Sequence, residues 1–223
     1  MAQIKLNATF GLTGTLPAVS GANLTNLDAR DLENALPAIS GASLTNVGGL
    51  VLTASATTAG STTSIDIADA FNSTYQSYLM VINRWRCDAD DRIGMRFGTS
   101  SAIDSTADCQ WTCNALQNDG TEGRTYTAGT ALDYILLNKF LDSDEDVGAS
   151  ASIWIHYPYE ATPYKIYHGT FGYSYTTADN IAISSVAGSK NNTTQFTHVQ
   201  LYNLYGNDIR SGGTIRFYGL VNA

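Results

Sequence analysis

YQSYLMVINRW, residues 75–85, is the stretch from which the fold class follows. In an extended chain, successive side chains point to opposite faces. The two resulting sets are Tyr78, Met80 and Ile82 on one side, and Leu79, Val81 and Asn83 on the other. The stretch is rich in β-branched and aromatic residues, and neither glycine nor proline interrupts it. We therefore predict a β-strand here.

Short segments of similar character follow one another from about residue 64, separated by turn residues. The further strand candidates are 50–52, 65–67, 93–97, 110–116, 131–140, 150–157, 164–175, 180–186, 195–204 and 214–221. Of these, 131–140 is ambiguous between strand and helix. This spacing is typical of two-sheet proteins, so we predict an all-β chain with a C-terminal antiparallel β-sandwich of jelly-roll type.

The composition agrees with an all-β protein and narrows the function classes. The 223 residues include 20 Gly and 13 Tyr, and only 14% are charged, which is typical of strands and turns. The net charge is −8, and the 12 Lys and Arg residues do not cluster. We therefore expect no nucleic acid partner and no anionic membrane partner.

The apolar residues are also too dispersed for a membrane protein. No apolar stretch approaches the roughly 20 residues that span a bilayer. The first residues, MAQIKL, are not followed by the apolar run and cleavage site of a signal peptide. We therefore expect neither secretion through a signal peptide nor insertion into a membrane.

A motif that occurs twice dominates the N-terminal part. LPAVSGANLTNL at 16–27 returns 20 residues later as LPAISGASLTNV at 36–47, with nine of 12 positions identical. A repeat unit cannot bury its apolar residues alone, and two copies are fewer than the about three that a solenoid needs. We therefore expect other copies of the chain to cover them around a symmetry axis. The apolar residues that these copies would cover are Leu16, Val19, Leu24, Leu27, Leu36, Ile39, Leu44 and Val47.

The repeat resembles those of tailed-phage fibre and virion proteins, especially of cyanophages and other aquatic phages. The opening segment 1–27 looks like the N-terminal segment of such proteins. Two later stretches, YPYEATPYK at 157–165 and SGGTIRFYGL at 211–220, resemble parts of their small β-sandwich heads. The resemblance implies a homotrimeric virion surface protein with a thin N-terminal attachment region and a globular C-terminal head. It transfers no catalytic residues to this chain.

This organisation predicts four regions. They are an extended virion-attachment arm at 1–15, a two-repeat stalk at 16–48, a junction at 49–63 and the β-sandwich head at 64–223. The arm is expected to contact other virion proteins, of the tail or the capsid, through sparse apolar anchors. These anchors are Ile4, Leu6, Phe10 and Leu12.

Tyrosines crowd one segment of the predicted head, between residues 157 and 175. Those within strands are interpreted as packing residues, because aromatic side chains favour sheets. Tyr157, Tyr159 and Tyr164 lie beside two prolines in a predicted loop. Tyrosine offers a large contact area with a polar tip and is enriched at interfaces. These three residues are our candidates for contact with a ligand or receptor, with strand packing as the alternative.

Histidines and acidic residues form no recognisable catalytic or metal set. His156, His168 and His198 fall in predicted strands, where we interpret them as half-buried polar residues. Residues 142–146 begin like an EF-hand loop but lack its glycine and its final glutamate. We interpret 142–146 and 88–91 as solvated acidic turns, and leave open calcium held by them between protomers. No cofactor is expected.

The three cysteines are Cys87, Cys109 and Cys113, and an odd number without a signal peptide predicts reduced thiols. On one strand, Cys109 and Cys113 would lie about 13 Å apart. That separation is too long for a disulfide unless the strand folds back.

We predict a non-enzymatic phage structural protein, a homotrimeric tail fibre or receptor-binding fibre. The alternative is a capsid decoration protein, either cement or head fibre, which the shortness of the chain favours. A glycan-cleaving tailspike ranks last, because such enzymes generally need a longer chain and paired carboxylates. The expected location is the virion, which would be assembled in the host cytoplasm. The expected partners are two further copies of the chain and other virion proteins, with a host surface glycan as a further candidate.

Overall fold

The computed structural model describes residues 49–100, 102–117, 124–138, 148–175 and 177–221. These residues form strands and connecting turns, and no helix is found among them. The strands are β1 (Leu50–Thr57), β2 (Ser64–Ile67), β3 (Ser77–Trp85), β4 (Ile93–Gly98), β5 (Cys109–Gln117), β6 (Arg124–Leu132), β7 (Ile135–Leu136), β8 (Ala149–His156), β9 (Lys165–Tyr175), β10 (Thr177–Lys190), β11 (His198–Asn203) and β12 (Thr214–Leu220). The protein is therefore all-β over the described ranges, as predicted.

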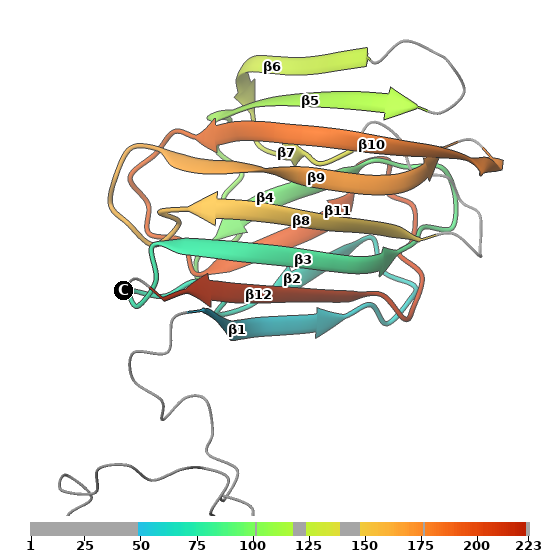
Figure 1. The fold of residues 1–223 in the computed structure, drawn as a ribbon. Helices are drawn as coiled ribbons and strands as arrows, with labels where there is room; N and C mark the ends of the chain where they lie inside the picture. The colour runs from blue at the N-terminus through green and yellow to red at the C-terminus, as the bar shows by residue number, and fades with distance from the viewer. Residues whose placement is uncertain (1–48, 101, 118–123, 139–147, 176, 222–223) are drawn as a thin grey trace, which may run out of the picture. The chain divides into compact units, whose positions relative to one another are not determined.

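The strands form two antiparallel sheets (Figure 1). The large sheet has eight strands in the order β1-β12-β3-β8-β9-β10-β5-β6. The small sheet has four, in the order β2-β11-β4-β7, and lies behind the large sheet in Figure 1. The chain passes repeatedly from one sheet to the other, so neighbouring strands are often distant in sequence.

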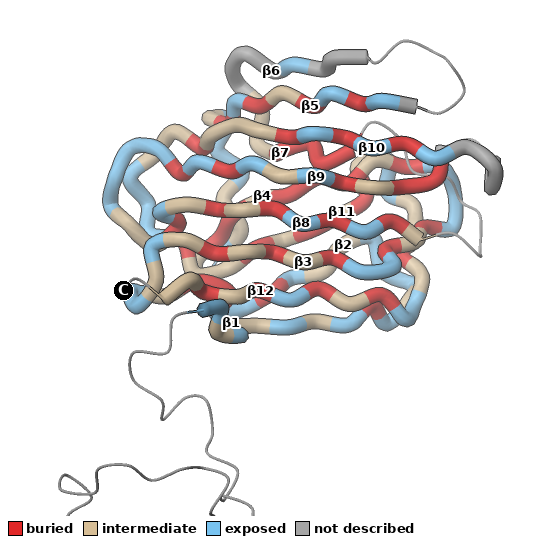
Figure 2. Tube along the Cα trace, viewed as in Figure 1, coloured by how far each residue is buried: buried red, intermediate tan, exposed pale blue. Residues whose placement is uncertain are grey.

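Side-chain alternation divides each strand of the large sheet into a buried and a more exposed set (Figure 2). In β3 the buried set is Tyr78, Met80 and Ile82, as the alternation in the sequence predicts. In β8, Ile153 and Ile155 are fully buried, whereas the alternate residues Trp154 and His156 are partly exposed. One face of the large sheet therefore belongs to the core.

Aromatic rings join the two sheets in that core. Phe71, in the β2–β3 connection, contacts Tyr78 of the large sheet with ring centroids 4.9 Å apart. Its ring also lies 5.7 Å from Phe217 of β12 and 6.0 Å from Phe97 of β4. Burying rings of this size contributes about 1.5–3 kcal/mol each, so this cluster stabilises the packing of one sheet on the other.

Two parts of the sequence prediction need correction. Segment 131–140 is not one strand: its first residues end β6, and a turn then leads to the two-residue β7. β6 itself was not expected, because its sequence RTYTAGTAL lacks the large apolar side chains that marked the other strands. Antiparallel pairing with β5 holds this sequence in a strand at the edge of the large sheet.

The acidic run 88–91 is also not wholly solvated. Asp91 is completely buried. Its carboxylate accepts backbone N–H bonds from Arg92 at 2.6 Å, Tyr205 at 2.9 Å and Asn207 at 3.2 Å. Asp91 therefore holds the turn after β11, because its oxygens satisfy backbone donors that would otherwise be buried without partners. The second acidic run, 142–146, lies outside the described residues.

The N-terminal predictions also lie outside the described residues. They concern the arm anchors Ile4, Leu6, Phe10 and Leu12 and the stalk residues Leu16, Val19, Leu24, Leu27, Leu36, Ile39, Leu44 and Val47. The chain divides into two compact units, Met1–Leu44 and Thr45–Ala223. The second unit includes β1, which pairs with β12 although its residues fall in the predicted junction.

The cysteines are all buried and none forms a disulfide. Cys109 and Cys113 both lie on β5, on the buried face. Burial raises the pKa of Cys109 to about 12 and that of Cys113 above its usual value. Both thiols therefore remain protonated, and they act as small core residues.

Candidate interaction surface

The exposed face of the large sheet carries a continuous row of apolar and aromatic side chains. The register places them side by side on five strands, β1, β12, β3, β8 and β9. In order across the sheet they are Leu52, Tyr218, Leu79, Trp154 and His168. Cross-strand neighbours of this kind lie about 4.5–5.5 Å apart at Cβ, so the row forms one surface. We call it the outer row.

Further apolar side chains extend this surface at one end of the sheet. Leu50 is 44% exposed and Ile166 is 47% exposed, while Leu52 in the outer row is 53% exposed. His156 lies between Leu50 and Ile166 in the order of the strands, and it pairs with Ser77 on one side and Ile166 on the other. Large apolar side chains gathered on one exposed face are typical of interaction sites.

The rings near the middle of the surface are nearly parallel. His156 lies 6.4 Å from Trp154 and 5.3 Å from His168 between ring centroids, with interplanar angles of 8° and 12°. Ser77 Oγ lies 2.9 Å from His156 Nδ1 and fixes that ring. Partial burial, and secondarily the neighbouring His168, lowers the pKa of His156. His156 is therefore neutral at neutral pH, which suits contact with an apolar partner.

The loop of candidate tyrosines begins directly after His156. Tyr157 is 41% exposed and Tyr164 is 55% exposed, at the two ends of the loop. The Tyr157 ring lies 6.3 Å from the His156 ring, so it continues the surface of the sheet. Tyr159 lies differently, because its side chain packs against the hydrophobic core. The structure thus places Tyr157 beside the candidate surface and gives Tyr159 a packing role.

A buried lysine holds this loop. Lys165, the first residue of β9, is completely buried. Its Nζ donates to the carbonyl oxygens of Glu160 at 2.7 Å, Thr162 at 2.6 Å and Asn192 at 2.9 Å. Burial lowers the pKa of Lys165 against the raising effect of Glu160 and Asp108. Three carbonyl partners compensate for the lost hydration of the ammonium and anchor the loop from within.

A second buried lysine braces the neighbouring loops. Lys190, at the end of β10, is 1% exposed. Its Nζ donates to Asp108 Oδ1 and to Thr106 O at 3.1 Å, and lies 3.3 Å from Asp104 Oδ2. Asn192 Nδ2 donates to both carboxylates at 2.9 Å. Phe196 lies between the two lysines, its ring centroid 5.9 Å from each Nζ.

All these features lie at one end of the large sheet, which we call the Leu50 end. Leu50 pairs with Leu220, Tyr78 with Gly219, and Ser77 with His156. β1 therefore begins at the end of the sheet that carries Tyr157, Lys165 and Lys190. In Figure 1 this end is on the left, beside the C-terminus.

The composition of the surface is suited to contact with a partner. It combines partly exposed aromatic and aliphatic side chains with two imidazoles. In the described ranges no three or more His, Cys, Asp or Glu side chains are grouped to hold a metal ion. The same residues contain no helix with the length and apolar character to cross a membrane.

Comparison with known proteins adds no family. No protein-family model, no curated protein sequence and no solved structure matches the chain.

Sequence reasoning anticipated part of this surface. In the sequence, Trp154 and His156 alternate with Ile153 and Ile155, and alternation alone assigns the two pairs to opposite faces of a strand. It could not place His168 opposite Trp154, because that neighbour comes from the register of another strand. Lys190 carries no local signal, since its partners Thr106, Asp108 and Asp104 lie 82 to 86 residues away. The burial of Lys165 has no local signal either, since its partner Asn192 lies 27 residues away.

Proposed function

We propose that this chain is a non-enzymatic structural protein of a tailed-phage virion, a homotrimeric tail fibre or receptor-binding fibre. Its head would be a jelly-roll-like β-sandwich on an extended stalk that carries the two repeats. The proposal combines the resemblance of the repeats with one structural observation: the outer row, next to the point where the N-terminal residues join the head.

The outer row supports the homotrimer because it offers a partner of the same kind something to bury. A stalk of residues 16–48 around a three-fold axis would bring three copies of β1 close together. Leu50 and Leu52, exposed on this strand, would then find apolar partners on a neighbouring protomer. Each buried leucine side chain would contribute about 1.5–3 kcal/mol.

The alternative is a capsid decoration protein. It shares the trimer, the head and the attachment arm, and differs only in which virion component the arm contacts and in whether the head binds a host. Exposed Tyr157 and Tyr164 favour the receptor-binding function, because tyrosines at the end of a rigid sheet are well suited to recognition.

Light scattering of the full chain tests the assembly. We expect a mass about three times the 23.9 kDa of one chain. A monodisperse monomer at micromolar concentration would contradict the proposal. Leu52→Glu should weaken association by about tenfold or more, because it removes the burial of one leucine. Ser55→Glu is the matched control, since Ser55 is exposed on the same strand and is outside the outer row.

Host adsorption separates the two functions. Tyr157→Asn with Tyr164→Ala should weaken adsorption if the head binds a receptor, and should leave it unchanged if the head decorates a capsid. Asn is chosen because Tyr157 has a φ of 60°, which Asn tolerates. Tyr205→Ala is the control, since Tyr205 is 59% exposed but follows β11 at the opposite end. Release of reducing sugar from host polysaccharide by the pure protein would overturn the non-enzymatic proposal.

A further inference from the structure

The cluster around Lys190 contains the groups needed for a covalent reaction as well as for an ion pair. Lys190 is the last residue of β10, and Asp104 and Asp108 lie in the segment that leads into β5. Antiparallel pairing of the two strands places Lys190 opposite Cys109, the residue that follows Asp108. The register of β5 and β10 therefore brings an amine against a carboxyl group that lies 82 residues away in the chain.

The contacts in this cluster give each group a distinct position. Lys190 Nζ donates to Asp108 Oδ1 and lies 3.3 Å from Asp104 Oδ2. Thr106 O accepts a further bond from Nζ at 3.1 Å, which fixes the direction of the amine. Asn192 Nδ2 donates at 2.9 Å to the other carboxyl oxygen of Asp108, Oδ2, and also to Asp104. A donor held on a carboxyl oxygen stabilises the charge that develops there when the carbon is attacked.

The cluster is also largely removed from water. Lys190 is 1% exposed, and the side chains of Asp104 and Asp108 are 17% and 16% exposed. The Phe196 ring centroid lies 5.9 Å from Nζ. Charges taken out of water lose hydration that their mutual attraction restores only in part. Burial therefore raises the free energy of the ion pair relative to a neutral product of the same two groups.

We propose that Lys190 and Asp108 become joined by an isopeptide bond, with Asp104 as the group that carries protons between them. The ammonium passes one proton to Asp108 by way of Asp104, and the neutral Nζ then attacks Cγ of Asp108. A second Nζ proton leaves through Asp104 to the hydroxyl on Cγ, the C–O bond breaks, and water departs. One ammonium and one carboxylate thus become one amide and one water molecule, and no oxidant or cofactor is needed.

Held geometry makes this reaction feasible, and the charge state makes it slow. Groups fixed in a reactive arrangement behave as if present at effective concentrations of about 10⁵–10⁸ M. Burial lowers the pKa of Lys190, but the hydrogen bond with Asp108 and the neighbouring charges raise it overall. The neutral amine is therefore a minor species. The freshly folded chain holds the ion pair, and the amide accumulates afterwards.

Lys165 is a matched control within the same chain. It is also completely buried, and its Nζ also lies 5.9 Å from the Phe196 ring centroid. Its Nζ, however, donates to the main-chain carbonyl oxygens of Glu160, Thr162 and Asn192. Attack on such a carbon would have to expel a backbone nitrogen and cut the chain. We therefore expect Lys165 to remain a free amine.

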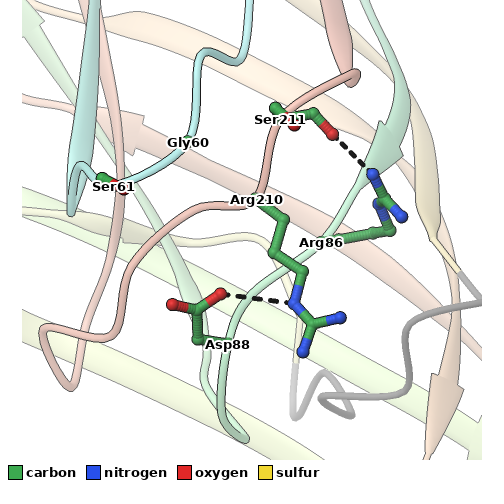
Figure 3. Close-up of a pocket in the computed structure, with 6 residues that line it drawn as sticks. All are labelled: Gly60, Ser61, Arg86, Asp88, Arg210 and Ser211. Atoms are coloured by element: carbon green, nitrogen blue, oxygen red, sulfur yellow. Dashed lines mark hydrogen bonds and ion pairs between the residues drawn. The ribbon is translucent and has the colours of Figure 1, made fainter.

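The ion pair at the opposite end of the large sheet is a second control. It lies at a pocket of ≈ 400 Å³ (Figure 3) that is lined by Gly60 and Ser61 of segment 58–62 and by Arg86, Asp88, Arg210 and Ser211. Arg210 Nε donates to Asp88 Oδ1 at 3.2 Å, and Asp88 is 55% exposed. A guanidinium stays protonated in proteins, so it supplies no nucleophilic lone pair. This pair can only remain ionic.

The bond would close a large loop of the chain at the Leu50 end. It would link the start of β5 to the end of β10, and the link would persist when the chain unfolds. A cross-link of this kind restricts the unfolded state, as a disulfide does, but resists reductants. The three cysteines of the chain form no disulfide, so the amide would be its only covalent brace among the described residues. The inference does not depend on the proposed virion function or on the outer row.

Mass spectrometry of the intact full chain tests the proposal, with samples taken over several days at physiological temperature. We expect a species lighter by the mass of one water molecule to accumulate in the folded protein. A chain kept unfolded in urea should keep its full mass, because the two groups are then no longer held together. In denaturing gel electrophoresis the lighter species should run ahead of the uncross-linked chain, because its unfolded form is more compact.

Tryptic digestion identifies the bond. We expect peptide 97–124, which contains Asp108, to be joined to 166–210, because the amide blocks cleavage after Lys190. Cleavage after Lys165 should continue. A succinimide at an aspartate would remove the same mass of water but would leave the two peptides separate.

Three substitutions assign the roles. Lys190→Arg keeps a cation between the carboxylates but removes the nucleophile, so the folded variant should keep its full mass. Asp104→Asn keeps a polar group of similar shape that cannot carry a proton, and should slow bond formation about a hundredfold or more. Arg210→Gln, at the opposite end, should leave the rate unchanged. Circular dichroism shows whether each variant is folded.

Three results would overturn the proposal: an unchanged mass of the folded chain, a loss of water with the two peptides separate, or the same loss in Lys190→Arg. The first two are measured on the unaltered chain, so they do not depend on whether a variant folds. An unchanged rate in folded Asp104→Asn would contradict the role given to Asp104.

Discussion

The two ends of the large sheet are held together by different interactions. At the Leu50 end, the loops are tied by the ammonium groups of Lys165 and Lys190, both buried. At the opposite end of the large sheet, which we call the Arg86 end, main-chain hydrogen bonds join the loops, among them Thr58 N–H to Gly213 O at 2.9 Å. An ion pair between Arg210 and Asp88 also bridges the loops there, but both side chains are partly exposed. The first arrangement therefore depends on ammonium groups that had to be removed from water, whereas the ion pair of the second stays near solvent.

This difference predicts how each end of the sheet responds to substitution and to pH. Burying an ammonium is unfavourable unless every N–H finds a partner, so loss of one partner there is expected to affect a whole loop. Main-chain bonds do not depend on side-chain identity or ionisation. We therefore expect the loops at the Arg86 end to withstand substitution of the pocket side chains, and those at the Leu50 end to respond to both substitution and pH.

The largest effect should come from Lys190→Met. It leaves the carboxylates of Asp104 and Asp108 without their cation, and breaking a buried ion pair in this way costs about 3–5 kcal/mol. Urea denaturation should show this loss of unfolding free energy. Arg210→Gln removes a more exposed pair at the other end and should cost about 0–1 kcal/mol. Equal losses in the two variants would remove the distinction between the ends.

Lys165→Met should have an intermediate effect. The methionine fills much of the same volume, but three carbonyl oxygens lose their donor, at a cost of about 1–3 kcal/mol. The change should be local, so we expect faster amide hydrogen exchange in 157–164 and unchanged exchange in 58–62. If the tyrosine loop contacts a receptor, adsorption to host cells should also weaken, although no tyrosine is altered. Unchanged exchange in 157–164 would show that the loop is held by its other contacts.

The smallest effect should be the response to acid, in two steps at the Leu50 end. Burial, and secondarily the neighbouring His168, lowers the pKa of His156 in the folded state. The neutral imidazole therefore contributes to the free energy of unfolding above pH 6.5, and this contribution is lost as the pH falls through the folded pKa. For Asp104, burial raises the pKa, but hydrogen bonds from Thr106 and the charge of Lys190 lower it overall. Its contribution is present above 3.8 and is lost at still lower pH.

Thermal denaturation at pH 7, 5 and 3 checks these steps. His156→Gln should flatten the change between pH 7 and 5, and Lys190→Met should flatten the change below pH 4. Exchange in 58–62 should respond to acid only when the whole fold does. If 58–62 opens before 157–164, the proposed difference between the two ends is wrong.

The sequence predicted the class of the fold and most of its strands for a simple reason. Alternation of side chains is a local property, so it is visible in Tyr75–Trp85 and again in 150–157 without any knowledge of the partners. It failed at β6, where small and polar side chains give little alternation of apolar character. There, pairing with β5 decides the conformation.

The candidate surface and the pocket depended more on the tertiary structure. Tyr157 and Tyr164 were recognisable from their composition and their neighbouring prolines, whereas Tyr159, from the same loop, packs against the core. Arg86 and Arg210 gave no signal, because they are 124 positions apart in a chain of scattered basic residues. Their proximity follows from backbone bonds between two loops.

What the sequence by itself determined is therefore the periodicity of the strands and the identity of the side chains each face can present. The tertiary structure decided which strands are neighbours, and hence that Leu52, Leu79 and Trp154 share one row. It also decided that Asp91, Lys165 and Lys190 are buried. The physical reason is that alternation acts between adjacent residues, whereas register, burial and charge pairing arise only when distant segments meet.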